Sequence, residues 1–282
     1  MILSPIEQSI KRKIEAVGTP LKDWDIQINY GIKTGFNDAF IISSEKRNEI
    51  LANCQSEDER KRTDELIRPI LRGRDIKRYG YDWAGLYLIA TFPSCHYDIE
   101  QYPAVKNYLL SFGIERLEQT GKVHNINGNK VKARKKTNNK WFETQDSISY
   151  WEDFSKPKIM WKRIGSILRF CFNENGALGL DSTCFAAGPY AEYLCCVLNS
   201  PMGHYLLKDS PKTGTGDLLV SVQAIEPLRI PTIKEEDRIK FKSMLSNISC
   251  VNSNKEREIN SFVFEKYKLD EHEVDYILRH YS

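Results

Sequence analysis

The sequence predicts an α+β fold with a mixed sheet and a C-terminal helical segment. Between residues 23 and 233, short apolar runs typical of strands alternate with segments of helical periodicity. After Thr232 only helical periodicity remains. The chain has 282 residues, of which 41% are hydrophobic and 28% charged, so it is able to bury a core. We therefore divide it into a lead-in helix at 1–22, a main domain at 23–233 and a helical tail at 234–282.

The first quarter of the chain changes its hydrophobic period once. Apolar residues at helical spacing over 6–17 predict an amphipathic helix that ends at Gly18. Alternation over 26–30 predicts a strand, and the glycine-containing segment 31–37 predicts a turn. The apolar run 39–42 predicts a second strand.

The second quarter combines helices with one buried strand. The highly charged segment 45–66 is predicted to be helical, and the apolar run 85–90 predicts a buried strand. One apolar face predicts a helix over 103–117. The polar segment 119–140, rich in Asn, Gly and Lys, predicts a long exposed loop. Loops of this length inside a domain usually have a function or are disordered.

The second half begins with strands and ends with helices. Two strands are predicted at 158–161 and 167–172, followed by a helix at 190–198. A glycine-rich turn then precedes a strand predicted at 218–222. The nearly balanced charge and the apolar faces of the tail at 234–282 predict helices that pack on a partner domain rather than on DNA.

Positive charge is concentrated in one segment of the chain. The formal net charge is only +3, and the tail is nearly balanced, with ten acidic and nine basic residues over 234–282. In contrast, 119–142 holds seven Lys or Arg and no acid. A surface that binds phosphates needs such local asymmetry, because affinity arises where condensed counterions are displaced.

Composition argues against several classes of protein. The seven cysteines form no C-x-x-C pair, and the histidines do not complete a metal-ligand spacing beside them, so we expect no bound metal. No run of about 18 apolar residues appears, and the first residues lack a secretory signal. We expect a cytoplasmic protein without a membrane partner.

Catalytic motifs are sparse. The glycine-rich cofactor loop and the Asn/Asp-Pro-Pro-aromatic motif of amino-methyltransferases are missing, and no phosphate-binding P-loop occurs. We therefore predict no catalytic residue in this chain. Acid-x-Lys triplets at Glu59 and Asp75 leave an alternative open, a Mg²⁺-dependent nuclease. For the second triplet we favour the structural explanation, an Asp that anchors a turn beside Gly73.

Several short segments resemble, in order, the TaqI-like C-terminal specificity domain of type IIG restriction–modification enzymes and related DNA adenine methyltransferases. They are Tyr30–Phe40, Ile67–Ile76, Lys140–Glu143, Phe154–Ile159, Leu198–Ser200 and Leu228–Pro231. The ending, Glu258–Glu273, resembles the helical ending of the same enzymes. The resemblance covers nearly the whole chain and implies a target-recognition domain that binds double-stranded DNA.

The resemblance also implies partners and cofactors. A separate methyltransferase domain, in cis or as a partner subunit, would methylate an adenine, and S-adenosylmethionine and Mg²⁺ are expected only in such partner domains. Residues Leu3–Glu7 resemble the junction that follows a methyltransferase, so we expect a fragment of a longer enzyme rather than a separate subunit. A protein-interaction module working through the helical tail is a further alternative.

DNA recognition needs cations for phosphates and planar polar groups for base edges. In the 122–140 loop we expect Arg134 and Asn138 or Asn139 to contact bases, although a merely solvated basic loop is the competing interpretation. Salt bridges within 72–78 and simple turn formation at 33–34 and 212–213 compete with DNA contact in the same way. The predicted DNA-binding residues are Lys33, Thr34, Arg72, Arg74, Lys77, Arg78, Lys130, Lys132, Arg134, Lys135, Lys136, Asn138, Asn139, Lys140, Lys162, Arg163, Lys212 and Thr213.

Overall fold

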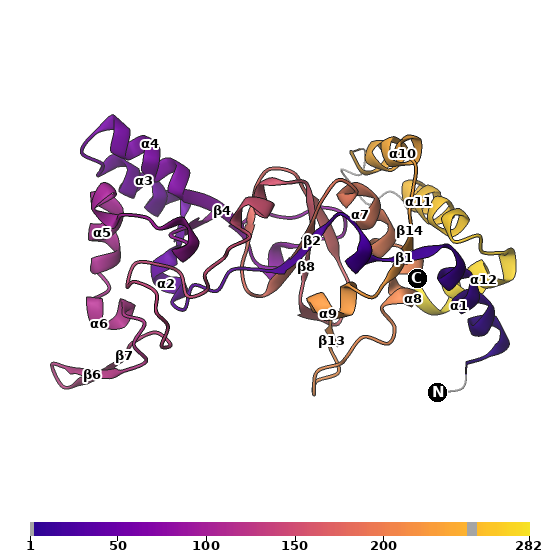
Figure 1. Ribbon diagram of the computed structural model, residues 1–282, viewed down its shortest axis with the longest axis horizontal. Helices are drawn as coiled ribbons and strands as arrows, with labels where there is room; N and C mark the ends of the chain where they lie inside the picture. The colour runs from indigo at the N-terminus through magenta and orange to yellow at the C-terminus, as the bar shows by residue number, and fades with distance from the viewer. Residues whose placement is uncertain (1–2, 247–252) are drawn as a thin grey trace.

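A computed structural model describes residues 3–246 and 253–282. The molecule is elongated, with a central sheet between a distal lobe and a helical end that contains both the first and the last helices (Figure 1). Helices and antiparallel and parallel strands are combined, and the chain closes with helices. The predicted α+β class with a C-terminal helical segment is therefore confirmed.

The central sheet separates two hydrophobic cores. Its antiparallel strands lie in the order β10 (Phe170–Asn173), β8 (Lys158–Lys162), β12 (Thr183–Ala187) and β2 (Gln27–Tyr30). Because successive side chains in a strand point to opposite faces, Trp161 packs into the core of the helical end and Met160 into the core of the distal lobe. Both side chains are buried.

The helical end brings the start and the finish of the chain into one core. Buried residues of all its helices belong to the same apolar cluster, so the apolar faces of the tail pack on this chain's own core and not, as predicted, on a partner domain. The helices are α1 (Pro5–Val17), α7 (Ala191–Asn199), α8 (Pro201–Leu206), α9 (Val222–Ile225), α10 (Glu235–Ser246), α11 (Ser253–Lys266) and α12 (Glu271–Tyr281). The boundaries at 22 and 233 stay predictions.

The distal lobe has its own sheet and helices. The sheet order is β11 (Leu178–Gly179), β4 (Ile67–Leu71), β5 (Leu86–Ile89) and β3 (Ile41–Ser43); β11 and β4 are parallel and the other pairs antiparallel. The helices are α2 (Asn37–Phe40), α3 (Ser44–Ala52), α4 (Glu57–Leu66), α5 (Pro103–Leu110) and α6 (Ile114–Leu117). Its core consists mostly of residues between Ile32 and Phe154.

Three short strand pairs and five 3-10 turns complete the described part. The pairs are β1 (Gly18–Pro20) with β14 (Arg229–Pro231), β9 (Ile164–Gly165) with β13 (Leu218–Leu219), and β6 (Val123–Ile126) with β7 (Asn129–Lys132). The 3-10 turns are Leu21–Asp23, Gly73–Asp75, Pro93–Cys95, Ile99–Gln101 and Trp151–Ser155.

Several predicted elements need correction. The segment 39–42 is a strand only from Ile41, because Asn37–Phe40 forms a helical turn first. The helix predicted over 103–117 is interrupted at Gly113, whose φ of +84° is incompatible with a right-handed helix. The strand predicted at 218–222 is limited to two residues. The long loop predicted over 119–140 contains the β6–β7 hairpin.

The described residues contain no helix that is long and apolar enough to cross a membrane. Their six cysteines are free thiols, four of them buried. The seventh, Cys250, lies outside the described residues.

Candidate nucleic-acid interface

Residues 122–136, which we call the basic hairpin, project from the end of the distal lobe (Figure 1). The two-residue turn between β6 and β7 has φ values of 51° at Asn127 and 81° at Gly128. Positive φ at both positions defines the type I′ turn, whose twist matches that of the flanking strands. Asn125 lies opposite Lys130 in the register, and Lys132 lies two residues further on, so these three side chains share one face.

Five lysines of the basic hairpin are exposed and form no ion pair with any described residue. They are Lys122, Lys130, Lys132, Lys135 and Lys136. Exposed Lys140 lies 5.5 Å from the centre of the Phe142 ring. Exposed Lys33 lies near the base of the hairpin, where its carbonyl oxygen accepts a hydrogen bond from the Gln145 amide. Unpaired lysines of this kind are available to phosphates.

Arg134 has a different position from the one expected of a base-contacting residue. Its side chain is only 2% exposed, which corrects the prediction that it contacts DNA. The guanidinium donates hydrogen bonds to four backbone carbonyls, those of Thr34, Leu117, Trp141 and Glu143, at 2.6–2.8 Å.

The surroundings of Arg134 explain why it is buried. The guanidinium carbon lies 4.9 Å from the centre of the Phe40 ring, and burial lowers the pKa of Arg134 to about 10. The carbonyls that accept these hydrogen bonds belong to the turn at Thr34, to the end of α6 and to the segment after the hairpin. Arg134 therefore fixes the base of the basic hairpin to the distal lobe.

Two further predicted residues also have local structural roles. The Asn139 amide donates to the carbonyls of Thr144 and Gln145 at 3.2 and 2.8 Å. Thr34 is 1% exposed, and its hydroxyl donates to Asn37 Oδ1 and accepts from the Phe36 amide. Neither side chain is free to contact a base, whereas Asn138 is exposed.

The cluster at 72–78 is mostly paired within the protein. Arg72 donates to both carboxylate oxygens of Asp75, which is itself buried. Arg78 pairs with Glu256 of α11 at 2.8 Å and donates to the Asn199 carbonyl at 2.7 Å. The Nζ of Lys77 lies 3.5 Å from Oδ2 of Asp82. Arg72 and Arg78 therefore make the structural salt bridges that competed with DNA contact in the sequence analysis, and Arg74 alone of these four cations is exposed.

Arg74 lines a groove that we call the basic groove, together with Lys162 and Arg169. The groove has a volume of about 260 Å³, and none of its lining residues is acidic. Gly73 forms part of its wall, where a Cβ would come within 2.8 Å of the Lys162 side chain. Arg163, the neighbour of Lys162, is half-buried with its Nε buried and unpaired, and it does not line the groove.

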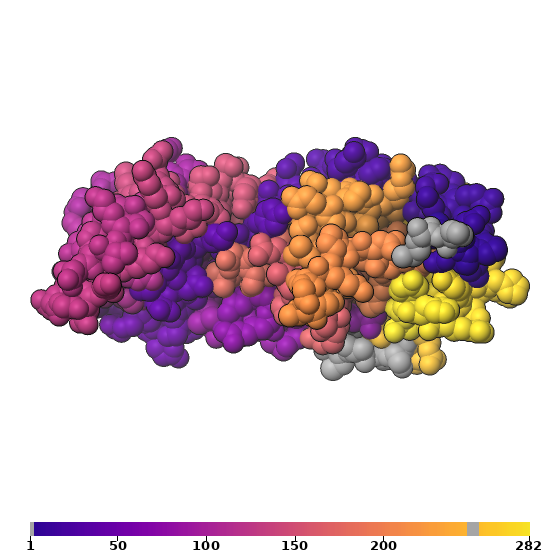
Figure 2. Space-filling model, turned by 90° about the horizontal axis from the view of Figure 1, so that it is seen from below, coloured from indigo at the N-terminus to yellow at the C-terminus, as the bar shows by residue number. Residues whose placement is uncertain are grey.

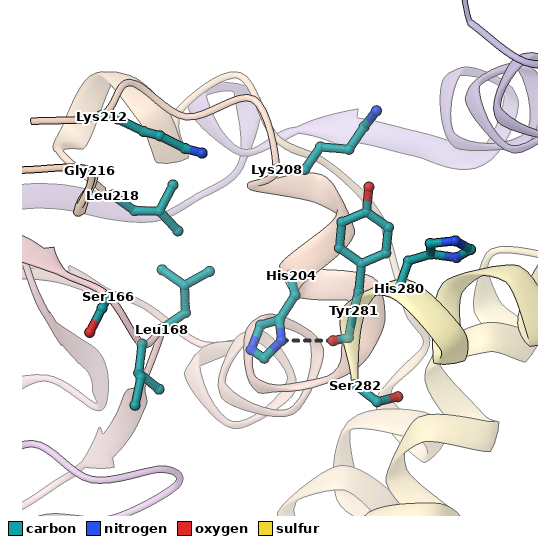
Figure 3. A pocket seen from close by; sticks show the side chains of 11 residues that line it. Ser166, Leu168, His204, Lys208, Lys212, Gly216, Leu218, His280, Tyr281 and Ser282 are labelled. Atoms are coloured by element: carbon teal, nitrogen blue, oxygen red, sulfur yellow. Dashed lines mark hydrogen bonds between the residues drawn. The ribbon is translucent and has the colours of Figure 1, made fainter.

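A second cavity, the α8 pocket, adjoins the basic groove through the residues Ser166 and Ile167, which line both. It measures about 580 Å³, and no Asp or Glu lines it. Its wall includes the residues Leu168, His204, Lys208, Lys212, Leu218 and Tyr281 (Figure 3).

The cations of the α8 pocket differ in availability. Lys208 forms ion pairs with Glu7 and Asp209, whereas Lys212 is exposed and has no ion pair among the described residues. The His204 Nδ1 lies 3.0 Å from the Tyr281 carbonyl oxygen, as drawn in Figure 3, and burial lowers the pKa of this imidazole. The Thr213 hydroxyl contacts that of Thr215 within the same turn.

Neither residue of the alternative nuclease site is arranged to bind a metal. Buried Asp75 is held by the amide and guanidinium of Arg72. Glu59 is 3% exposed and accepts hydrogen bonds from the amides of Gln55 and Ala104. Among the described residues no group of three or more His, Cys, Asp or Glu could hold a metal ion.

Sequence reasoning missed three features of this surface. The Asn127–Gly128 dipeptide is a strong local signal for a hairpin, yet the polar composition around it favoured a loop. Asn125 therefore went unnoticed as an exposed amide beside Lys130. Arg169 was placed in a strand, although β10 begins only at Phe170.

Comparisons with known proteins show a related fold. Most of the chain, 94%, superposes on 36% of MmeI, a type IIL restriction–modification enzyme solved in complex with DNA, with a TM-score of 0.57 and 11% identity. BpuSI, a type IIG restriction endonuclease, gives a TM-score of 0.49 and 14% identity over 94% of this chain and 34% of that enzyme. The chain thus spans about a third of the length of either enzyme. No family model and no curated protein matches.

Proposed function

We propose that this chain is a sequence-specific double-stranded DNA recognition module of a restriction–modification enzyme. The observation that carries the proposal is the group of unpaired lysines on the basic hairpin, which a two-stranded ribbon of these dimensions can present to the major groove. The fold shared with part of MmeI supports the class of parent enzyme. Membership of the TaqI-like family remains a prediction from the ordered sequence segments.

The basic hairpin and the loop that leads into β13 both extend toward the lower side of the molecule (Figure 1). Figure 2 looks at this side, where the segment around 120–140 occupies one end and the segment around 205–225 lies nearer the middle. We propose that DNA lies along this side, with the basic hairpin at one end and the basic groove with Lys212 further along. Counterion release from both regions would supply the affinity.

The parent enzyme would supply the chemistry. We propose a separate adenine methyltransferase domain, in cis or as a partner subunit, toward which this module positions its DNA. S-adenosylmethionine, and Mg²⁺ if the enzyme also cleaves, would bind in that partner. The small share of MmeI covered by this chain leaves room for such domains.

A salt titration tests DNA binding. Fluorescence anisotropy with a 30-base-pair duplex of random sequence between 50 and 300 mM salt should give an affinity that falls steeply with salt. The double substitution K130A/K132A should lower the slope of log K against log salt by about 2, because about two phosphate contacts are lost. Salt-independent binding, or no binding at the lowest salt, would refute the proposal.

The control is K61A/K240A, which removes two exposed lysines from α4 and α10, on the upper side in Figure 1. Its slope should equal that of the wild type. Specificity is tested by selection from a randomised duplex pool, from which a single motif should be enriched. Cleavage of a plasmid by this chain alone with Mg²⁺ would favour a nuclease instead.

A further inference from the structure

The loop between β9 and β10 places one aliphatic side chain among cations. Ile167 is 62% exposed, and it lines both the basic groove and the α8 pocket. The charged residues that line the two cavities are Arg74, Lys162, Arg169, Lys208 and Lys212, with no acid among them. Ile167 is therefore an exposed apolar side chain shared by two cavities whose charged side chains are all cationic, although Lys208 is paired with Glu7 and Asp209.

A second exposed isoleucine shows what is particular about this position. Ile239 on α10 is also 62% exposed, but its cavity is lined by Glu236 and Glu258 as well as Lys240 and Lys255. Isolated exposed aliphatic side chains are common on protein surfaces and need no function. What distinguishes Ile167 is that no Asp or Glu side chain lines either of its two cavities, so cationic side chains flank it on both sides.

The loop that carries Ile167 is held at both ends. On one side, Ile164 and Gly165 pair with Leu219 and Leu218 in the β9–β13 ribbon. On the other side, the amide of fully buried Phe170 donates to the side-chain carbonyl of Asn199 at 3.0 Å. Only residues 166–169 span the interval, and the χ1 angle of a β-branched residue is restricted. The position of the Ile167 side chain is therefore well defined before any ligand binds.

We propose that Ile167 is a wedge that enters the base stack of bound DNA. Proteins that deform DNA insert apolar side chains of this kind between base steps, and the adjacent cations hold the displaced backbone. In this arrangement the basic groove binds phosphates on one side of the wedge, and Lys212 binds them on the other. The α8 pocket, about 580 Å³ in volume, gives the displaced nucleotides room. The proposal rests on the proposed function, since it describes how the same surface binds DNA.

The test compares an intact 30-base-pair duplex with one that carries two adjacent central mismatches. Unstacking costs less at mismatches, so a wedging protein should bind the mismatched duplex about tenfold more tightly. I167A should bind both duplexes with similar affinity, whereas I167M should keep the preference. I239A is the matched control and should behave as the wild type.

A spectroscopic readout separates wedging from simple attraction. With 2-aminopurine placed beside the mismatch, fluorescence should rise on binding wild type and I167M and stay low with I167A. If wild type binds both duplexes equally, or if I167A retains the preference and the fluorescence rise, the wedge is wrong while DNA binding stands. If wild type binds neither duplex at low salt, the proposed function fails first. Loss of binding by I239A as well would mean that exposed aliphatic residues contribute in general, which would also overturn the wedge.

Discussion

At the scale of single residues, buried cations carry much of the local architecture of the distal lobe. Arg134 donates hydrogen bonds to four backbone carbonyls, and buried Lys158 donates to the Phe154 carbonyl and the Asn173 side chain. Neither makes an ion pair with a described carboxylate. A lysine or arginine in this sequence therefore does not always indicate ligand binding, because Arg134 and Lys158 stabilise the fold through hydrogen bonds to carbonyl groups.

Removal of the Arg134 guanidinium should destabilise the fold. R134A would leave the carbonyls of Thr34, Leu117 and Trp141 without the side-chain donor they have now, which should lower the free energy of unfolding by about 3 kcal/mol or more. Urea unfolding measures the loss. The neighbouring K136A removes an exposed lysine and should change stability by less than about 0.5 kcal/mol. Equal stability of the two variants would contradict the structural role of Arg134.

Lys158 should make stability depend on pH. Its side chain is fully buried, and burial lowers its pKa from 10.5 to about 7. Between pH 7 and 8.5 the unfolded chain therefore binds a proton that the folded chain has released, and the free energy of unfolding rises with pH. The rise should be at most about 1.4 kcal/mol per pH unit.

Below about pH 7 both states hold the Lys158 proton, so this contribution to the slope disappears. K158M removes the titrating group and should lose the rise between pH 7 and 8.5. Urea unfolding of wild type and K158M over pH 6–8.5 gives the difference in stability at each pH. A difference that stays constant over the whole range would show that Lys158 is charged in the folded state.

At the scale of elements, the sequence predicted what local periodicity determines. Helix α1 shows its apolar stripe directly in the sequence, so it was predicted close to its true bounds; the structure adds a capping box of Ser4 and Glu7 at its start. The strands β5 and β8 are apolar runs that only a buried position explains. Such elements are determined by residues that are close together in the sequence, so one sequence is enough to predict them.

Other elements depend on partners far along the chain. Arg134 contacts Thr34, one hundred residues away, and no local pattern marks which arginine of a basic segment turns inward. The pairs of β9 with β13 and of β1 with β14 are too short to show alternation. The sequence therefore pointed to the segment 119–140 as the candidate site. Which of its residues are exposed and which are structural depends on contacts with distant parts of the chain, which the sequence does not show.

At the scale of the whole molecule, the C-terminal helices stabilise the core that begins with α1. Five fully buried tail residues pack there, namely Phe241, Ile259, Val263, Tyr267 and Ile277. Lys13 of α1 contacts buried Glu273 of α12, and Arg78 contacts Glu256 of α11. The tail and the rest of the chain are thus one cooperative unit at this end.

Deletion of residues 234–282 should therefore abolish folding rather than remove an accessory surface. The exposed apolar face of α7 should cause aggregation, which size-exclusion chromatography and the loss of near-ultraviolet circular dichroism would show. As the matched control, replacement of residues 123–132 by a short Gly-Ser linker should leave the unfolding transition unchanged. A soluble, cooperatively folding deletion variant would contradict this view of the core.

The central sheet has a consequence for how such a chain can change over evolutionary time. The backbone leaves the sheet after Tyr30 and returns at Lys158, two strand spacings across the sheet and three residues along β12, so the two points lie about 14 Å apart. Nearly all of the distal lobe is thus inserted between two neighbouring points of a scaffold. Units with close ends are readily exchanged between proteins. A replacement lobe would have to cover the sheet face formed by Met160, Cys171 and Phe185, pair with β11, and keep the contacts that Arg78 and Tyr79 make with the helical end.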